Sequence, residues 1–101
     1  MKIILNNTEY ELIKDYKDAF DLDELTRLFT EYFYNFDYIL GDYAYNKLRL
    51  KGFYDNDNKK ANDINKYDYI DDYLKNYCAY ECRYFLLKKK KTQNSVEKNA
   101  K

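Results

Sequence analysis

The sequence predicts an α+β fold in which a mostly antiparallel sheet of about five strands carries two helices packed on one face. Residues 45–54 alternate in side-chain character with a period of two, which is typical of a strand. Residues 21–33 and 68–77 instead repeat apolar side chains at helical spacing. With turn residues between these segments, the predicted order is strand, strand, helix, strand, strand, helix, strand.

The N-terminal segment predicts a hairpin of residues 2–5 and 8–13. Asn6 and Asn7 lie between the two runs, and asparagine tolerates the positive φ angles that tight hairpin turns require. Residues 14–20 have no clear period and are expected to form a polar connector.

The first helix has a start signal at Asp21, which can cap its N-terminus, with Glu24 three residues later to complete a capping box. One face of this helix would be apolar and belong to the core. That face comprises Leu22, Leu25, Leu28, Phe29, Tyr32 and Phe33.

Residues 36–54 hold both glycines of the chain and predict two strands around a turn. We expect the turn at Gly41, where an apolar run meets Asp42. Gly52 interrupts the second strand, and we expect a bulge or a close backbone approach there.

The remaining chain predicts a surface loop over residues 55–66, a second helix over 68–77 capped by Asp68, and a buried strand over 83–87. The domain is expected to cover residues 1–88, with 89–101 a disordered lysine-rich tail. The predicted core residues are Leu25, Leu28, Phe29, Phe33, Leu48, Leu50, Leu74, Phe85 and Leu87.

The central segment resembles the YutD-like family of small bacterial proteins. That family's pattern runs approximately Tyr-Asp-Tyr-Ile-x-Gly-Asp-Trp, then Leu-Arg-Leu-Lys-Gly-Phe-Phe, an Asp-rich loop, a helix and Tyr-Cys. The corresponding segments here are 36–43, 48–54, 55–58 and 77–78, with Tyr43 in place of the expected Trp. The resemblance spans roughly residues 9–88 and implies a fold and a cytosolic location, and it implies no particular activity.

The overall charge excludes a strongly basic nucleic-acid coat protein, because 18 basic and 18 acidic residues give zero net charge. A binding surface must therefore come from a local patch. No apolar stretch reaches the length of a membrane span and no signal peptide is evident, so a cytoplasmic protein is expected. In a reducing compartment, Cys78 and Cys82 are expected to be free thiols.

Catalytic and metal chemistry have weak support in this sequence. There is no histidine, and Ser95 lies in the predicted tail, so a common nucleophile–base pair is missing. Asp37 and Asp42 are the best candidates for a small enzyme, with structural roles in the turn as the alternative. Cys78 and Cys82 offer half a zinc site or small buried side chains, and we predict no metal and no cofactor.

The most site-like array is a predicted basic-aromatic face, on which cations alternate with rings. It consists of Tyr43, Tyr45, Lys47, Arg49, Lys51 and Phe53. Rings can stack on bases while cations contact phosphates, so we predict a non-catalytic binding module for nucleic acid or a ribonucleoprotein. A protein partner on the same face is the alternative. A solvated face whose charges pair with acids such as Glu9 or Glu11 is the non-functional explanation.

Overall fold

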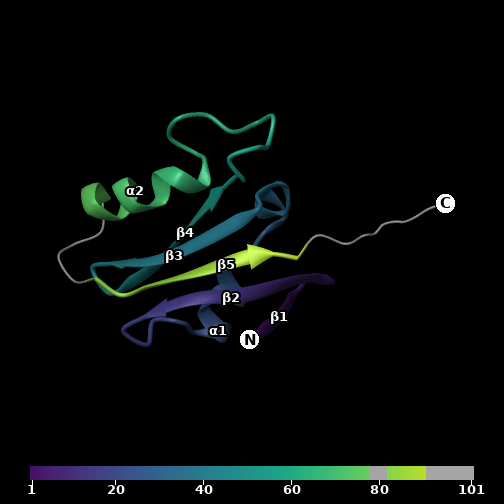
Figure 1. Ribbon diagram of the computed structural model, residues 1–101. Coiled ribbons are helices and arrows are strands. Elements are labelled where there is room, and N and C mark those ends of the chain that lie inside the picture. The colour runs from purple at the N-terminus through teal and green to yellow at the C-terminus, as the bar shows by residue number, and fades with distance from the viewer. Residues whose placement is uncertain (78–81, 91–101) are drawn as a thin grey trace.

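The computed structural model describes residues 1–77 and 82–90 and shows one antiparallel sheet with strand order β1-β2-β5-β3-β4 (Figure 1). The elements are β1 (Lys2–Leu5), β2 (Thr8–Tyr16), α1 (Leu22–Leu28), the 3-10 helix η1 (Glu31–Asn35), β3 (Tyr38–Ala44), β4 (Lys47–Phe53), the 3-10 helix η2 (Tyr67–Tyr69), α2 (Ile70–Tyr77) and β5 (Tyr84–Lys89). The predicted fold class, strand number and element order are confirmed.

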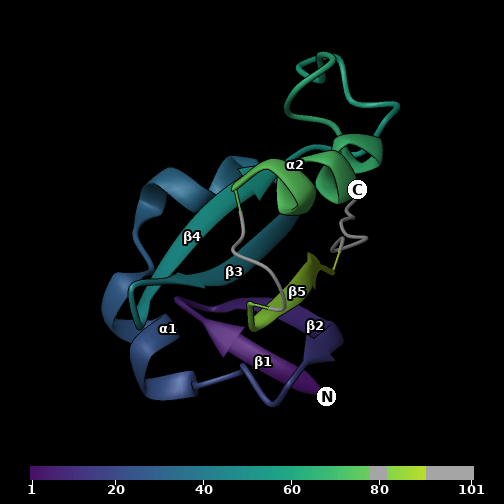
Figure 2. The same cartoon turned by 90° about the vertical axis from the view of Figure 1, so that its left-hand side faces the viewer.

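The two helices lie on opposite faces of the sheet, so the prediction that both pack on one face is wrong. Phe85 and Leu87 of β5 join the core beneath α1, whereas Leu86 between them joins a second core with Ile70 of α2. Figure 2 shows α1 and α2 on either side of the strands. The central strands are apolar on both faces, and each face therefore requires a cover.

The N-terminal hairpin forms as predicted, with Asn6 and Asn7 at φ angles of 49° and 66°. Strand β2 continues to Tyr16, through the segment predicted to be a connector. Residues 14–16 of β2 are exposed, but their backbone pairs with β5 and this pairing keeps them in the sheet. The segment was not predicted as a strand because backbone pairing leaves no signal in the periodicity of the side chains.

Helix α1 begins at the predicted cap, where Asp21 Oδ1 accepts a hydrogen bond from the Glu24 N–H at 3.2 Å. The Glu24 carboxylate pairs with Arg27. The helix ends after Leu28, and Thr30 is extended before η1 begins. The predicted apolar face is consequently broken, and Tyr32 is 67% exposed.

The central hairpin turns at Tyr45 and Asn46, not at Gly41. Gly41 lies in the middle of β3, where an added Cβ would come within 2.6 Å of the Phe85 ring. At Gly52 the register is unbroken, so the predicted bulge is absent, and the group that approaches closely is a side chain and not backbone: an added Cβ there would come within 2.6 Å of the Phe36 ring. Both glycines are therefore required by packing against a ring.

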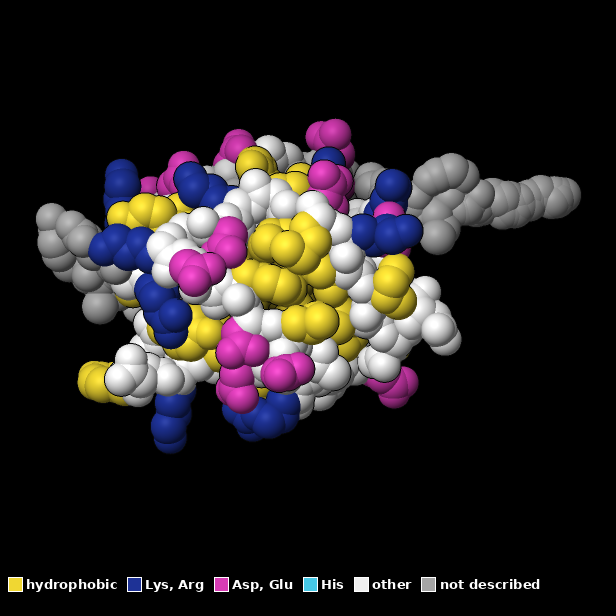
Figure 3. Space-filling view, turned by 90° about the horizontal axis from the view of Figure 1, so that it is seen from below, with side chains coloured by type: hydrophobic (Ala, Val, Ile, Leu, Met, Phe, Trp, Pro, Cys, Tyr) yellow, Lys and Arg dark blue, Asp and Glu magenta, His cyan; other side chains and the backbone are white. Residues whose placement is uncertain are grey.

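Most of the predicted core residues are buried, and Leu28, Leu50 and Leu74 are partly buried. The prediction missed several fully buried residues, namely Tyr10, Ile39, Leu40 and Phe53. Seen from below, past β1 and α1, hydrophobic side chains remain visible at the centre of the surface with charged side chains around them (Figure 3). The seven-residue α1 covers this face of the sheet together with η1, which contributes the buried Phe33.

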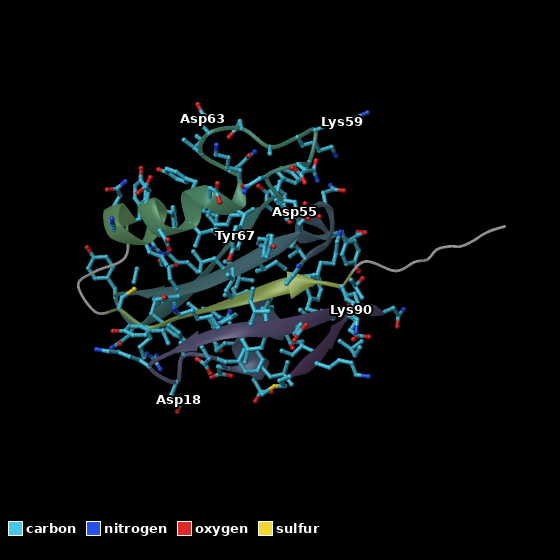
Figure 4. The ribbon with its side chains drawn as sticks, in the orientation of Figure 1. Asp18, Asp55, Lys59, Asp63, Tyr67 and Lys90 are labelled. Carbon is cyan, nitrogen blue, oxygen red and sulfur yellow. The ribbon has the colours of Figure 1, made fainter. Side chains whose placement is uncertain are left out.

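The last strand extends beyond the predicted domain boundary. Lys89 pairs with Tyr10, and its Nζ donates a 2.6 Å hydrogen bond to the Tyr34 carbonyl. Lys90 lies beside the β1–β2 hairpin, with its Nζ 3.4 Å from Glu9 Oε2 (Figure 4). Lys89 and Lys90 therefore belong to the folded domain, and the rest of the predicted tail, 91–101, lies outside the described residues.

Candidate functional site

The six residues of the predicted basic-aromatic face all lie on the β3–β4 hairpin, but the structure does not place them on one open surface. Tyr45 lies at the hairpin tip, 99% exposed, with a φ of 52° that is unusual for an aromatic residue. Lys47 follows it at the start of β4 and is exposed. These two residues are the freely accessible part of the array.

Helix α2 covers the other end of this face. Phe53 is completely buried, and its ring packs edge-on against Tyr73 of α2. Lys51 lies over both rings, with its Nζ 5.4 Å and 5.5 Å from their centres. The ammonium therefore caps an aromatic cluster, as in other cation–π contacts.

Arg49 is held by an ion pair with Asp42, the opposite residue on β3. Its Nη2 lies 2.6 Å from Oδ2 and its Nε lies 3.2 Å from Oδ1, while Nη2 also donates to the Tyr77 carbonyl. Asp42 is only 2% exposed. The carboxylate raises the pKa of Arg49 through these hydrogen bonds, and the guanidinium fastens α2 to the hairpin.

Tyr43 lies on the opposite face of the sheet, toward α1. Its hydroxyl donates a hydrogen bond to the Ala19 carbonyl, and the Arg83 guanidinium lies 4.0 Å from its ring centre. Burial raises the pKa of Tyr43. This tyrosine belongs to the packing of the β2–α1 connection, separate from the other five residues.

Strand β4 is an edge of the sheet, and no strand among the described residues pairs along its outer side. The two-residue turn makes Ala44 and Lys47 a hydrogen-bonded pair, so Arg49 and Lys51 also bond to β3 while Leu48, Leu50 and Gly52 point outward. Tyr54 agrees with this alternation, since it bonds outward to Asn65 and Tyr67. Within residues 1–77 and 82–90, the outward groups of Leu48, Leu50 and Gly52 have no hydrogen-bond partner.

A groove of about 450 Å³ follows this open edge, and we call it the β4 groove. On the α1 side it is lined by the rings of Tyr32, Phe36 and Tyr54, and on the α2 side by Arg49, Lys51 and Tyr73. Phe36 and Tyr54 pack with ring centres 4.8 Å apart, and Tyr32 packs against Phe36 at 5.3 Å. The groove thus combines an open strand edge with aromatic rings and cations.

Four of these groove residues were not predicted: Tyr32, Phe36, Tyr54 and Tyr73. Tyr32 was assigned to the core, and the other three come from separate elements. Their only local signal is Gly52, whose missing side chain leaves room for the Phe36 ring. Knowing that they share a groove requires the strand order, which puts β4 at the edge.

A second hollow, of about 200 Å³, lies between α2 and the sheet. Its lining includes Leu86 and Tyr84 of β5, Lys14 of β2, and Ile70 and Leu74 of α2. Tyr67, which also lines this hollow, is labelled in Figure 4. Its ring packs against the Tyr38 ring at a tilt of 36°, with the ring centres 4.6 Å apart. This hollow is smaller than the β4 groove and carries no open backbone edge.

The two carboxylates proposed for an enzyme do not meet. Asp37 Oδ2 accepts hydrogen bonds from the Asp55 N–H and the Asn58 Nδ2, which ties down the following loop. Asp42 is engaged by Arg49. The two residues are five positions apart in extended chain, which separates them by roughly 16 Å. This distance is too great for the two carboxylates to act together on one substrate atom.

The expectation of free thiols is wrong for Cys82, which is disulfide-bonded; Cys78 lies outside the described residues. That expectation was based on the redox state of the expected compartment. Whether a disulfide can form also depends on the distance between the two sulfur atoms, which the compartment does not determine. Within residues 1–77 and 82–90, no three His, Cys, Asp or Glu side chains are grouped as metal ligands. In the same ranges, no helix is long and apolar enough to cross a membrane.

Comparison with known proteins agrees with the resemblance seen in the sequence. The family model described as "Putative antitoxin YutD-like" matches residues 4–88. "Putative antitoxin YutD" of Bacillus subtilis (strain 168) is 39% identical over 87 residues, covering 86% of this chain and 96% of that protein. The solution NMR structure of B. subtilis yutD superposes with a TM-score of 0.78 at 34% identity, covering 98% of this chain and 90% of that chain. The chain therefore belongs to the YutD-like family.

Proposed function

We propose that this protein is a non-catalytic, antitoxin-like module that acts by binding a partner protein through the β4 groove. The observation that carries the proposal is the groove itself, where an open strand edge runs between tyrosine and phenylalanine rings and an arginine. Tyrosine and arginine are enriched among the residues that dominate protein interfaces.

The geometry favours a protein over a nucleic acid as the partner. Stacking of successive bases needs exposed rings beside free cations. Here Phe53 is buried, Tyr43 lies on the other face, and Arg49 is paired with Asp42. The name of the B. subtilis relative also supports a protein partner, because an antitoxin acts by neutralising another molecule that harms the cell.

The binding test compares three forms of the full chain: wild type, Tyr32→Ala in the groove and Tyr16→Ala on β2 outside it. Both tyrosines are at least partly exposed, so neither change should unfold the protein. A partner recovered with wild-type protein should bind Tyr32→Ala roughly 30-fold more weakly and Tyr16→Ala about equally, as for an aromatic interface anchor. Affinities are measured by calorimetry with the purified partner.

The antitoxin part of the proposal is tested in cells. Expression of that partner alone should slow growth, and co-expression of wild type or Tyr16→Ala should restore it, whereas Tyr32→Ala should restore it poorly. Equal affinity of both variants for the partner would refute the groove as the site. Recovery of RNA instead of protein, with binding lost when Lys47 is replaced by glutamate, would favour the nucleic-acid interpretation.

A further inference from the structure

The open edge of β4 already shows how another strand can add to it. At its end, Tyr54 forms an isolated parallel bridge with Lys66. Tyr54 donates to the Asn65 carbonyl and accepts from the Tyr67 N–H, both at 2.8 Å. The chain thus pairs one outward residue of this edge by itself and leaves Leu48 and Leu50, nearer the hairpin tip, without a backbone partner among the described residues.

Leu48 and Leu50 each have an outward N–H and C=O without a hydrogen-bond partner among the described residues. Gly52 also points outward, but it is buried beside the Phe36 ring and is left out of the proposed pairing. Unpaired edge groups are a template for an added strand, and proteins commonly protect such edges. An extended peptide that pairs here gains main-chain hydrogen bonds, while its alternate side chains fall on the two walls of the β4 groove.

The two walls differ in chemistry and select different side chains. The α1 wall has the Phe36 and Tyr54 rings beside Leu50, and suits apolar residues. The α2 wall presents Arg49 and Lys51, and Lys47 continues the same side of β4 beyond the groove toward the hairpin tip. An extended segment with apolar residues on one side and acidic residues on the other matches both walls.

The cations on the α2 wall are not balanced by acids. Arg49 is paired with Asp42, but neither Lys47 nor Lys51 has an ion-pair partner within the described residues. The wall therefore keeps an excess of positive charge, which favours an acidic segment and speeds its approach.

The same cations disfavour a second copy of this chain as the occupant. An antiparallel pairing of two β4 edges centred on Leu50 places Arg49 of each copy opposite Lys51 of the other. Like charges directly opposite one another destabilise a strand pair. Lysines on an exposed edge are a recognised protection against such self-association.

We infer that β4 receives an extended, acidic segment of the partner protein as a sixth strand of the sheet. This inference rests on the proposed function and specifies how the partner binds. Apolar residues of the added segment contact Phe36, Leu50 and Tyr54, and acidic residues face Lys47 and Lys51.

The probe is a ten-residue peptide that alternates glutamate with valine, and the comparison peptide replaces each glutamate with lysine. Residue-resolved amide hydrogen exchange is followed by NMR on the full chain at low salt. The glutamate peptide should slow exchange at Leu48 and Leu50 roughly ten-fold or more, because these amides gain partners. The Ile4 amide on the opposite edge should not change, and the lysine peptide should slow none of these amides.

Charge variants test the acidic preference. Lys47→Glu should weaken binding of the glutamate peptide about ten-fold at low salt, and Lys51→Gln somewhat less, since exposed ion pairs contribute modestly. Lys2→Glu, on the β1 edge, is the matched control and should bind like wild type.

The inference is overturned if the glutamate peptide at millimolar concentration leaves exchange at the Leu48 and Leu50 amides unchanged. It is also overturned if the purified partner binds without slowing them, which would leave the proposed function standing. Protection by the peptide with no protein partner found in cells would instead count against the proposed function alone. Equal binding of both peptides would refute the preference for acidic segments.

Discussion

Replacing Gly41 with alanine tests how the two central strands fit together. Alanine in a strand is usually more favourable than glycine by about 0.5 to 1 kcal/mol, because glycine loses more backbone freedom on folding. At Gly41, however, the new methyl group would meet three atoms at the far end of the Phe85 ring, including Cε2 at 2.6 Å and Cε1 at 2.8 Å. The expected sign of the effect is therefore reversed.

The size of the effect follows from how little the ring can move. Phe85 is completely buried, and Phe20 packs edge-on against it with ring centres 5.3 Å apart. Overpacking of such a site typically costs about 1 to 3 kcal/mol. We expect Gly41→Ala to lower the free energy of unfolding within that range, measured by urea unfolding followed by circular dichroism.

A double-mutant cycle isolates the contact. Leucine lacks the three ring atoms that the new methyl group meets, so in a Phe85→Leu background Gly41→Ala should be neutral or stabilising. The matched control is Gly52→Ala with Phe36→Leu. There the crowded atoms are Cγ, Cδ1 and Cδ2, which leucine retains, so little relief is expected. Equal costs of Gly41→Ala in the wild-type and Phe85→Leu backgrounds would refute this account of Gly41.

Three further outcomes are expected. Tyr10→Phe should leave the free energy of unfolding at pH 7 unchanged or raise it by up to about 1 kcal/mol, because the buried hydroxyl has no hydrogen-bond partner within the described residues; a loss above 1 kcal/mol in urea unfolding would contradict this. Burial raises the pKa of Tyr10 and Tyr38 from 10.0 to about 12, with Asp55 adding to the shift at Tyr38. The folded state thus holds these protons more tightly, so the contribution of each of these two tyrosines to the free energy of unfolding should be constant below pH 10 and fall between pH 10 and 12 by about 2 to 3 kcal/mol; Tyr10→Phe should make the fall over that interval smaller by about 2 to 3 kcal/mol, and an unchanged pH profile would argue against it. Arg49→Met should cost about 3 kcal/mol by leaving the buried Asp42 carboxylate unpaired, with Asp42→Leu in the same chain recovering most of the loss, and failure to recover would indicate that Arg49 acts through α2 instead.

The elements of the fold could be predicted because their signals are local. Asn6 and Asn7 accept the left-handed backbone of a tight turn, and Asp21 supplies the oxygen that caps α1. The apolar run at Phe85, Leu86 and Leu87 indicated a strand buried on both sides. Each of these signals depends on a few neighbouring residues, so a short stretch of sequence contains all the interactions that produce it.

The placement of the elements depends on residues far apart in the chain. The turn was expected at Gly41, but a glycine looks the same whether it bends the backbone or makes room for a distant ring such as Phe85. The sheet order and the opposite positions of α1 and α2 likewise arise from pairing and packing between segments that no short window contains.

The candidate site shows the same division. The alternation of Lys47, Arg49 and Lys51 is a property of the sequence, and it correctly indicated a strand with one basic side. Whether that side is open depends on α2, which buries Phe53, and whether the strand has a free edge depends on β4 being last in the sheet. The order of residues in the sequence thus determined which side chains β4 carries on each side. Tertiary packing decided which of these groups a partner can reach, because burial and backbone pairing are set by contacts across the whole domain.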